Sequence, residues 1–440
     1  MGRKLFGTDG VRGVAGEVLT AELALALGRA ATQELRSDDA PRVLVIRDTR
    51  ESGEMLEAAL AAGVAAAGGD VLLGGVLPTP AAPLLLGRYG FDLAVVISAS
   101  HNPYRDNAIK LFGPDGAKLA DDVELAIERR LGAAAAGPPE RMGRVRTLHG
   151  TLDDYLRELG ERFDGLDLTG VDVVLDCANG ATYRAAPEIF GRLGATVTTI
   201  ADAPDGRNIN EGVGSTHVEA LGRAVAEGGH DLGFAFDGDG DRVLAVDRTG
   251  AVVDGDELIA LAALHLRAAD RLPGSGVVVT VMTNYGFHVA MAEAGIEVAT
   301  TGVGDRYVLE ELRARGWVLG GEQSGHVIEM GFNATGDGIA SALLTLEALA
   351  GRDLAERGGM RKLPQRLVNV PVADRDAAMA APELLAAAER ENEELRGRGR
   401  VLVRPSGTEQ LVRVMVEAPT AEEADAACER LVALVPGAAI

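Results

Sequence analysis

The chain has 440 residues and a formal net charge of −23, so it is long enough for several domains and too acidic to bind nucleic acid or an anionic membrane non-specifically. No apolar run reaches the ~18 residues that cross a bilayer, the start lacks the hydrophobic stretch of a signal peptide, and two cysteines cannot build a disulfide framework. We therefore expect a cytoplasmic protein without nucleic-acid or membrane partners.

The first part of the chain shows strands alternating with helices. A glycine-rich stretch at residues 7–13 (GTDGVRG) could line an anion site, although a plain turn fits it equally well. Helices are predicted at residues 20–35 and 52–67, and strands at residues 43–46 and at Leu93–Ile97. This alternation indicates a mostly parallel α/β sheet, in which ligands gather at the loops after the strands.

One such loop, residues 98–103 (SASHNP), carries two hydroxyls beside an imidazole. A serine nucleophile elbow requires G-x-S-x-G. Neither Ser98 nor Ser100 has those glycines, so a hydrolase triad is unsupported. The same residues fit a structural turn with an Asn102 cap equally well. Downstream, Lys110 could meet an anion or a proton in transfer.

A stretch rich in Ala, Gly and Pro at residues 132–143 predicts a linker. A second α/β unit then begins with a strand at residues 171–175. The T-x-x-E pattern at residues 216–219 has the spacing of a capping box and predicts a helix start, with His217 on the surface.

The most informative stretch is the acidic loop at residues 236–242 (FDGDGDR). Three carboxylates spaced two residues apart lie on one side of an extended or looped backbone and repel one another unless a cation lies between them. Oxygen ligands without Cys or His favour Mg²⁺, Ca²⁺ or Mn²⁺. An EF-hand is excluded because Arg242 and Arg248 stand where Gly and Glu are required. The alternative is a solvated Asp-Gly turn. The three carboxylates belong to Asp237, Asp239 and Asp241.

A third unit contains a strand at residues 277–281 and two glycine-rich motifs. The first, residues 301–306 (TGVGDR), fails the dinucleotide fingerprint because Tyr307 occupies the third glycine position, and the sequence has no G-x-x-x-x-G-K-[ST] phosphate loop. The second, residues 321–326 (GEQSGH), places Glu, Ser and His on a glycine-flanked loop, as a reader of sugar hydroxyls would.

The last segment begins near residue 367, with strands, a helix at residues 377–395 and a terminal helix. Between the helices lies RPSGTE at residues 404–409, followed by a strand that contains Arg413. Hydroxyls, backbone amides and two arginines are the ingredients of a phosphate cradle, because arginine can grip phosphate with two parallel hydrogen bonds.

Four of these motifs, in this order, resemble those of the α-D-phosphohexomutase family, and the resemblance covers essentially the whole chain. It implies three similar α/β domains with mostly parallel sheets and a smaller C-terminal α+β domain, arranged around a central cleft. The expected domains are residues 1–150 with a phosphoserine loop, 151–252 with a metal loop, 253–366 with a sugar-recognition loop, and 367–440 with a phosphate site.

The resemblance implies an isomerase in which phosphoserine at Ser100 exchanges its phosphoryl group with a hexose phosphate through a 1,6-bisphosphate. Mg²⁺ would be held by Ser100, Asp237, Asp239 and Asp241. The candidates for the general acid or base are, in order, Lys110, His326 and His101. A further catalytic candidate is Arg242. Substrate contacts would come from Thr8, Arg12, Gly302, Asp305, Glu322, Ser324, Arg404, Ser406, Gly407, Thr408 and Arg413.

Within the family, residues 7–16 (GTDGVRGVAG) and Gln323 are most similar to bacterial members that act on glucosamine phosphates and supply UDP-N-acetylglucosamine and cell-wall precursors. Relatives for glucose or mannose phosphates, the nearest alternative, more often carry Met in place of Gln323. Glucosamine 1,6-bisphosphate would be the intermediate or activator. Ala108 and Gln410 depart from the family pattern without removing a charge or a nucleophile.

Two other classes of function stay open, a non-catalytic sugar-phosphate sensor and a Mg²⁺-dependent phosphatase. The expected partner is a small phosphosugar substrate, and the protein is expected to be a monomer or a homodimer.

Overall fold

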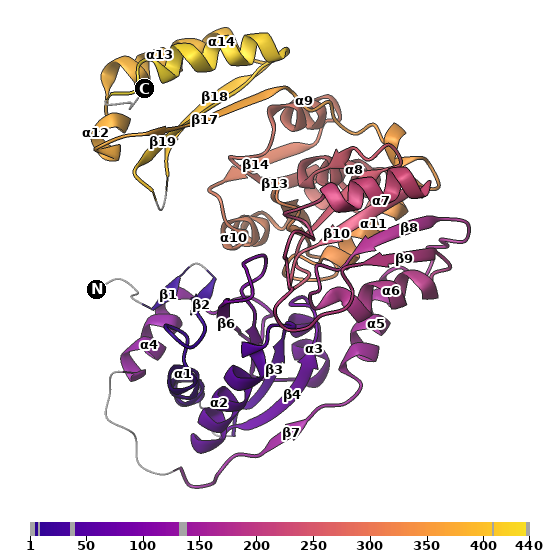
Figure 1. Cartoon of the computed structure of the whole chain (residues 1–440), viewed down its shortest axis with the longest axis vertical. Coiled ribbons are helices and arrows are strands. Elements are labelled where there is room, and N and C mark those ends of the chain that lie inside the picture. The colour runs from indigo at the N-terminus through magenta and orange to yellow at the C-terminus, as the bar shows by residue number, and fades with distance from the viewer. Residues whose placement is uncertain (1–4, 8, 36–39, 132–138, 407–408, 437–440) are drawn as a thin grey trace. The chain divides into compact units, whose positions relative to one another are not determined.

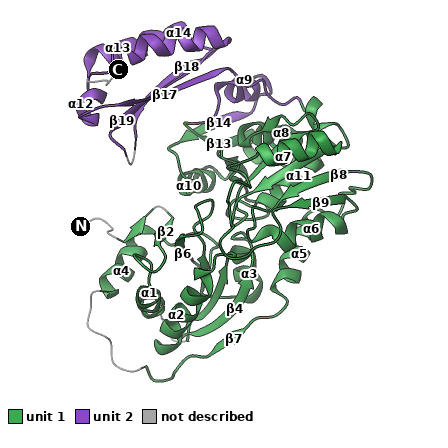
Figure 2. Ribbon diagram, viewed as in Figure 1, with its two compact units in different colours: residues 1–281, 299–357 green, residues 282–298, 358–440 purple. Residues whose placement is uncertain are grey.

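The computed structural model describes the chain except for residues 1–4, 8, 36–39, 132–138, 407–408 and 437–440 (Figure 1). The chain divides into two compact units, coloured green and purple in Figure 2. Unit 1 comprises residues 1–281 and 299–357, and unit 2 comprises residues 282–298 and 358–440. Within the described residues, no helix is both long and apolar enough to cross a membrane.

Unit 1 begins with a seven-stranded sheet. Its strands are β1 (Phe6–Gly7), β2 (Gly10–Val14), β3 (Arg42–Arg47), β4 (Asp70–Val76), β5 (Leu93–Ile97), β6 (Asp106–Phe112) and β7 (Val145–Thr147). The order is β1-β2-β6-β5-β3-β4-β7. Strands β5, β3, β4 and β7 run parallel, whereas β1, β2 and β6 extend the sheet in antiparallel pairs. The helices are α1 (Ala21–Glu34), α2 (Ser52–Ala66), α3 (Ala81–Tyr89) and α4 (Asp121–Leu131).

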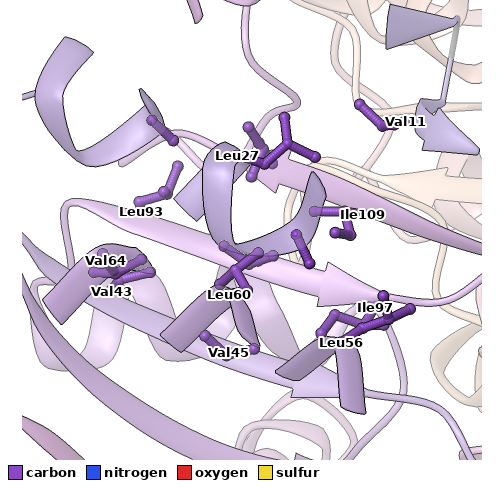
Figure 3. Packing of buried hydrophobic residues seen from close by; sticks show 14 of the residues in the cluster. Val11, Leu27, Val43, Val45, Leu56, Leu60, Val64, Leu93, Ile97 and Ile109 are labelled. Carbon is purple, nitrogen blue, oxygen red and sulfur yellow. The ribbon is translucent and has the colours of Figure 1, made fainter. Parts of the chain in front are cut away.

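The core of this part lies between the sheet and the helices α1 and α2 (Figure 3). Leu27, Leu60 and Val45 are at most 1 % exposed there, and each such burial stabilises the fold by about 1.5–3 kcal/mol. The two helices approach so closely that a Cβ on Gly63 would lie 2.0 Å from the carbonyl oxygen of Leu25.

The next part of unit 1 is a five-stranded sheet made of β8 (Asp172–Asp176), β9 (Thr196–Ile200), β10 (Leu232–Phe236), β11 (Val243–Asp247) and β12 (Val252–Val253). In the order β12-β11-β10-β8-β9, β10, β8 and β9 are parallel, and β11 and β12 are antiparallel. The helices are α5 (Thr151–Arg162), α6 (Thr182–Arg192) and α7 (Glu219–Gly228).

The capping box predicted at residues 216–219 is wrong. The N-cap of α7 is Val218, which offers no capping side chain, and Glu219 is the first helical residue. A capping box needs the glutamate three positions after the N-cap.

The third part of unit 1 is built on a four-stranded sheet in the order β14-β13-β15-β16, although the first two residues of β14, Glu297 and Val298, belong to unit 2. It is made of β13 (Gly276–Thr280), β14 (Glu297–Thr301), β15 (Leu319–Gly321) and β16 (Val327–Glu329), with helices α8 (Gly255–Ala268), α10 (Asp305–Arg315) and α11 (Gly338–Leu349). Helix α8 has a capping box formed by Asp254 and Glu257, which we did not predict. Short 3₁₀ helices lie at Pro273–Ser275 and Leu354–Glu356.

Unit 2 is an antiparallel sheet in the order β17-β19-β18 with helices. Its elements are α9 (Tyr285–Glu293), β17 (Gln365–Pro371), α12 (Arg375–Met379), α13 (Pro382–Glu394), β18 (Arg400–Pro405), β19 (Leu411–Glu417) and α14 (Ala421–Val432). The single helix predicted at residues 377–395 is wrong. It is two helices, because Pro382 starts a new one at its favoured first position. Glu417 accepts the backbone N–H of Tyr285 at 2.8 Å, which ties α9 to β19.

The predicted fold class, α/β with a smaller C-terminal α+β part, is confirmed. The sheets of unit 1 are mixed, because parallel central strands are extended by antiparallel strands at one edge. The loops after the parallel strands are therefore where the chemistry of unit 1 is expected.

A buried hydrogen bond joins two parts of unit 1. Tyr155 on α5 donates its hydroxyl to the carboxylate of Asp337, with distances of 2.9 and 3.0 Å to the two oxygens. Tyr155 is 0 % and Asp337 is 2 % exposed. Asp337 is also the N-cap of α11 and accepts the backbone N–H of Ala340 at 3.0 Å. Burial raises the pKa of Asp337 to about 6, so each donor matters for keeping it ionised.

We predict that Tyr155→Phe lowers the free energy of unfolding by about 1–3 kcal/mol, because it removes a donor from a buried carboxylate. Urea unfolding measures the change. The matched control, Tyr183→Phe on α6, removes a hydroxyl from a half-buried ring and should change stability by no more than about 0.5 kcal/mol. Equal losses in both variants would contradict the structural role of the bond.

Candidate functional site

Loops from three parts of unit 1 line a cavity of about 1040 Å³. The loop after β5 contributes Ser100 and His101, and the acidic loop between β10 and β11 contributes Asp241 and Arg242. The other predicted site residues that line it are Arg12, Asp305, Glu322 and His326. The motifs of the first, second and third predicted domains therefore meet at one site.

Ser100 occupies an unusual backbone conformation. Its φ is 54°, a left-handed value that costs a non-glycine residue of order 1–3 kcal/mol. The Ser100 backbone N–H donates to Ser98 Oγ at 2.9 Å. Its own Oγ donates to Asp237 Oδ2 at 2.5 Å and lies 3.3 Å from His101 Nδ1. The loop thus directs the Ser100 hydroxyl towards the acidic loop, whereas Ser98 supports the turn.

The acidic loop concentrates three buried carboxylates. Asp237 and Asp239 are 1 % exposed and Asp241 is 8 % exposed, and each offers an oxygen within 4.8 Å of those of the other two. Burial, followed by the charges of Asp241 and Asp239, raises the pKa of Asp237 well above its ordinary value. Among the described residues, Oδ1 of Asp239 and Oδ1 of Asp241 are buried without a hydrogen-bond partner. A divalent cation would satisfy these oxygens and remove the repulsion, so the donor set fits Mg²⁺.

Two side chains outside the acidic loop fix Asp239. Thr79 Oγ1 donates to Asp239 Oδ2 at 2.6 Å, and Lys110 Nζ donates to the same oxygen at 2.8 Å. Oδ1 is thereby left for a metal. We did not predict the part of Thr79, which lies between two prolines after β4 and has no chemical signature in the sequence.

The acidic loop also fits tightly against its neighbours. A Cβ on Gly238 would lie 2.6 Å from the carbonyl oxygen of Ser100, and one on Gly325 would lie 2.1 Å from that of Val243. Only glycine permits these approaches. The Val243 N–H donates to the Gly325 carbonyl at 3.1 Å, so the predicted sugar-recognition loop is bonded to the strand that follows the metal loop.

The three general acid/base candidates differ in their contacts. Lys110 Nζ lies 2.8 Å from Asp239 and 3.3 Å from Asp9; burial lowers its pKa, but these carboxylates outweigh burial and hold the pKa above its usual value. Burial, with Arg242 and Arg12, lowers the pKa of His101 below 6.5. Lys110 is therefore a fixed cation, and His101 is neutral near pH 7.

His326 has both ring nitrogens engaged. Nε2 accepts the backbone N–H of Gly336 at 3.1 Å, which requires that nitrogen to be unprotonated. Nδ1 lies 3.5 Å from Asp241 Oδ2. The ring thus supports the acidic loop from the third part of unit 1.

The remaining predicted substrate residues of unit 1 are placed as follows. Arg12 pairs with Asp9 at 2.9 Å, and Asp305 pairs with Lys118 at 2.6 Å, a partner that we did not predict. Glu322 accepts the Gly304 N–H at 3.0 Å. Gly302 and Ser324 do not line the cavity, although among the described residues Ser324 Oγ is buried without a partner.

Gln323, which together with residues 7–16 was the basis for the predicted glucosamine preference, does not line the cavity either. Its amide donates to Asp254 Oδ2 at 3.2 Å, at the cap of α8. Any influence of Gln323 on sugar choice is therefore indirect.

In unit 2, the predicted phosphate residues lie on neighbouring strands. Arg404 and Arg413 stand directly opposite each other in the β18–β19 register, where like charges destabilise a sheet. Burial and the charge of Arg413 lower the pKa of Arg404. Among the described residues, Arg413 Nε is buried without a partner. The Ser406 carbonyl accepts Arg375 Nη1 at 2.6 Å, a third arginine that we did not predict. Thr8, Gly407 and Thr408 lie outside the described residues.

Comparison with known proteins identifies the class. Models of the phosphoglucomutase/phosphomannomutase α/β/α domains I, II and III match residues 3–136, 153–250 and 254–369, and that of the C-terminal domain matches residues 367–434. The chain belongs to this family of phosphohexomutases, which confirms the expected class of isomerase. It is 53 % identical over 428 residues to phosphoglucosamine mutase of Moorella thermoacetica, with 96 % of each chain covered. It is 52 % identical over 435 residues to that of Mycobacterium marinum, with 96 % and 97 % covered.

Solved structures share the fold. A phosphoglucomutase/phosphomannomutase family protein from Burkholderia thailandensis superimposes with a TM-score of 0.82 at 26 % identity, covering 99 % of this chain and 98 % of that one. Aspergillus fumigatus N-acetylphosphoglucosamine mutase, solved with GlcNAc-6P and magnesium, gives 0.71 at 20 % identity and covers 98 % and 95 %.

We predict that the protein binds Mg²⁺ at the acidic loop. Isothermal titration calorimetry with MgCl₂ should show binding that Thr79→Val weakens by about 10–100-fold, as expected for a residue that orients a ligand, and that Asp239→Asn weakens at least as much. Asp164→Asn, which removes the same charge at an exposed position, is the control. Unchanged affinity in Asp239→Asn would contradict the site.

Proposed function

We propose that the protein interconverts glucosamine 6-phosphate and glucosamine 1-phosphate, with Ser100 as the phosphoryl carrier. The observation that carries the proposal is the 2.5 Å hydrogen bond from Ser100 Oγ to Asp237 Oδ2, which sets a buried hydroxyl against a carboxylate cluster at a cavity. The two relatives at 52–53 % identity over nearly the whole chain are phosphoglucosamine mutases, which supports glucosamine as the sugar.

The proposed cycle starts from phosphorylated Ser100. The C1 hydroxyl oxygen of glucosamine 6-phosphate forms a bond to phosphorus, the bond from phosphorus to Ser100 Oγ breaks, and the proton lost by the hydroxyl passes to Oγ. The resulting glucosamine 1,6-bisphosphate then reorients within the site, so that its 6-phosphate faces Ser100. Ser100 Oγ then attacks the 6-phosphoryl group, and the sugar O6 leaves with a proton. Glucosamine 1-phosphate is released and the phosphoserine is restored.

We assign the proton transfer to His101, whose Nδ1 lies 3.3 Å from Ser100 Oγ, a distance that one small adjustment closes. This reverses the order expected from the sequence, because Lys110 and His326 are committed to the acidic loop. Lys110 and Arg242 would instead add positive charge beside the transferring group.

Asp237, Asp239, Asp241 and the phosphate on Ser100 would hold Mg²⁺. When bound, the ion would neutralise charge on the phosphoryl group, which is the main demand of phosphoryl transfer. The protein's own part is to keep the three carboxylates together and to aim Ser100 at them.

Substrate contacts are assigned by family resemblance and by position. Glu322 and Ser324 would bind sugar hydroxyls, and the opposed arginines Arg404 and Arg413, with Ser406, would hold the non-reacting phosphate. Arginine suits that role because its planar fork binds phosphate bidentately. The other proposed substrate contacts are Thr8, Arg12, Gly302, Asp305, Gly407 and Thr408. The cytoplasmic location, the domain boundaries, the monomer or homodimer and the supply of cell-wall precursors stay predictions.

We predict that Ser100→Ala lowers kcat by at least about 10³-fold, because it removes the group that forms the covalent intermediate. The wild-type protein, incubated with glucosamine 1,6-bisphosphate, should gain one phosphate at Ser100 by intact mass and peptide mapping. Ser275→Ala is the control, because Ser275 lies on the 3₁₀ helix before β13 and does not line the cavity; this variant should still be phosphorylated at Ser100. Normal turnover by Ser100→Ala would overturn the carrier role, and stoichiometric release of inorganic phosphate would indicate a phosphatase.

We predict that kcat/KM is highest for glucosamine 6-phosphate when compared with glucose 6-phosphate and mannose 6-phosphate. A preference of about tenfold or more corresponds to about 1.4 kcal/mol of differential transition-state binding. Gln323→Met should change the preference less than about threefold, because its amide is bound to Asp254. A higher value for glucose or mannose phosphate would establish the alternative substrate class.

A further inference from the structure

The sequence D-T-R at residues 48–50, directly after β3, has no part in the cycle above. Yet Arg50 is 0 % and Asp48 is 1 % exposed. Arg50 Nε donates to Asp48 Oδ2 at 2.8 Å, and the Arg50 backbone N–H donates to Asp48 Oδ1 at 2.9 Å. A buried ion pair of this kind is costly to desolvate and is weak evidence for stability by itself. The reason for burying Arg50 must therefore lie in its other hydrogen bonds.

The other four N–H donors of Arg50 all bind backbone carbonyls, three in the serine loop (residues 98–103) and one at Asp106, the first residue of β6. Nη2 donates to the carbonyls of Ser100 at 2.9 Å and Asn102 at 2.8 Å. Nη1 donates to that of Asp106 at 2.9 Å and to that of Pro103. The guanidinium has five N–H groups, and all five are used within the protein. Arg50 therefore has no donor left for a phosphate or a sugar.

A second side chain binds the same carbonyls from another part of unit 1. Asn210 Nδ2 donates to Ser100 O at 2.9 Å and to Asn102 O at 3.0 Å, and Asn210 is 8 % exposed. Its own φ is 58°. The Ser100 carbonyl is thus held by both Arg50 and Asn210.

The N–H side of Ser100 is fixed through Asp48. Ser98 Oγ donates to Asp48 Oδ2 at 2.6 Å and accepts the Ser100 N–H at 2.9 Å. Both polar groups of the Ser100 backbone are therefore bonded into one network, and Ser100 is the residue of this loop with a left-handed φ of 54°.

We propose that Arg50, acting with Asp48, Ser98 and Asn210, is a positioning residue that holds Ser100 in its left-handed conformation so that Oγ reaches Asp237. This inference rests on the proposed function, because it takes Ser100 as the phosphoryl carrier. The network acts through the backbone and touches neither substrate nor the transferring group. A role of this kind changes the rate of phosphoryl transfer and leaves substrate binding unchanged.

The test uses Arg50→Lys, which keeps the charge beside Asp48 but replaces a planar fork of five donors by three donors on one nitrogen. Glucosamine 1,6-bisphosphate is added to the dephosphorylated protein and phosphate on Ser100 is followed by intact mass. The phosphorylation rate and kcat should fall about 10–100-fold, as expected for a misplaced reacting group, with KM for glucosamine 6-phosphate within about twofold of wild type.

Arg42→Lys is the matched control. Arg42 lies at the start of β3, at the opposite end of the strand from Asp48, and its Nη1 donates to the carbonyls of Tyr89 and Gly90. Its substitution should leave kcat, KM and the phosphorylation rate at wild-type values. Melting temperatures of both variants separate loss of fold from loss of positioning.

A second variant keeps the inference testable if Arg50→Lys fails to fold. Asn210→Gly keeps a residue that accepts positive φ and removes the side chain that carries the Nδ2 donor, so it should show the same fall in kcat and phosphorylation with unchanged KM. A folded variant that has wild-type kcat and phosphorylation rate overturns the inference, as does a rise in KM alone. If the wild-type protein itself takes no phosphate at Ser100, the proposed function is what fails.

Discussion

Mutual repulsion among three buried carboxylates is the constraint on which the site depends. Burial and the charges of Asp241 and Asp239 raise the pKa of Asp237, so the loop is unfavourable unless cations compensate it. Lys110 and Thr79 bind one oxygen of Asp239 and leave the other without a partner among the described residues. The protein thus compensates the charge only in part, and this incomplete compensation creates affinity for a divalent ion.

The loop that carries Ser100 packs against these carboxylates and directs the Ser100 hydroxyl towards them. Its hydroxyl approaches the carboxylates because the backbone of Ser100 adopts a left-handed conformation and because Gly238 has no side chain to separate the two loops. The rest of unit 1 supplies rigidity. The parallel strands of each sheet place the loops that follow them at the same edge of the sheet, and buried polar groups hold the loops in position. Precise placement of the reacting group is worth several orders of magnitude in rate, which accounts for a buried network around one serine.

The parts of the site that were predictable from the sequence are those whose chemistry lies in neighbouring residues. Alternating Asp and Gly at residues 237–241 indicate a cation site, and the structure brings those carboxylates together. Thr79 stands 160 positions from Asp239, which it binds, and Arg50 binds carbonyls 50–56 positions away. Such pairings leave no periodicity or spacing in the chain, because they arise only when strands distant in sequence become neighbours.

Predictions from local patterns also failed where a pattern gives the residue types but not the position of the helix start or the partner of a side chain. The T-x-x-E pattern at residues 216–219 is present, yet the helix starts at the glutamate. Gln323 lies in the predicted recognition loop, yet its amide binds Asp254. The fold class was predicted more securely, because alternation of strands and helices extends over hundreds of residues and single departures do not obscure it.

The balance between the acidic aspartates and the basic residues beside them has a consequence for the binding of the metal ion and the phosphoryl group. With its three aspartates ionised, and with Lys110 and Arg242 beside them, the cluster carries one net negative charge. A divalent cation and a doubly ionised phosphoryl group together add none. Holding the ion and the phosphoryl group together therefore leaves the net charge of the fully ionised cluster unchanged, so the loaded site needs no further compensating charge from the fold.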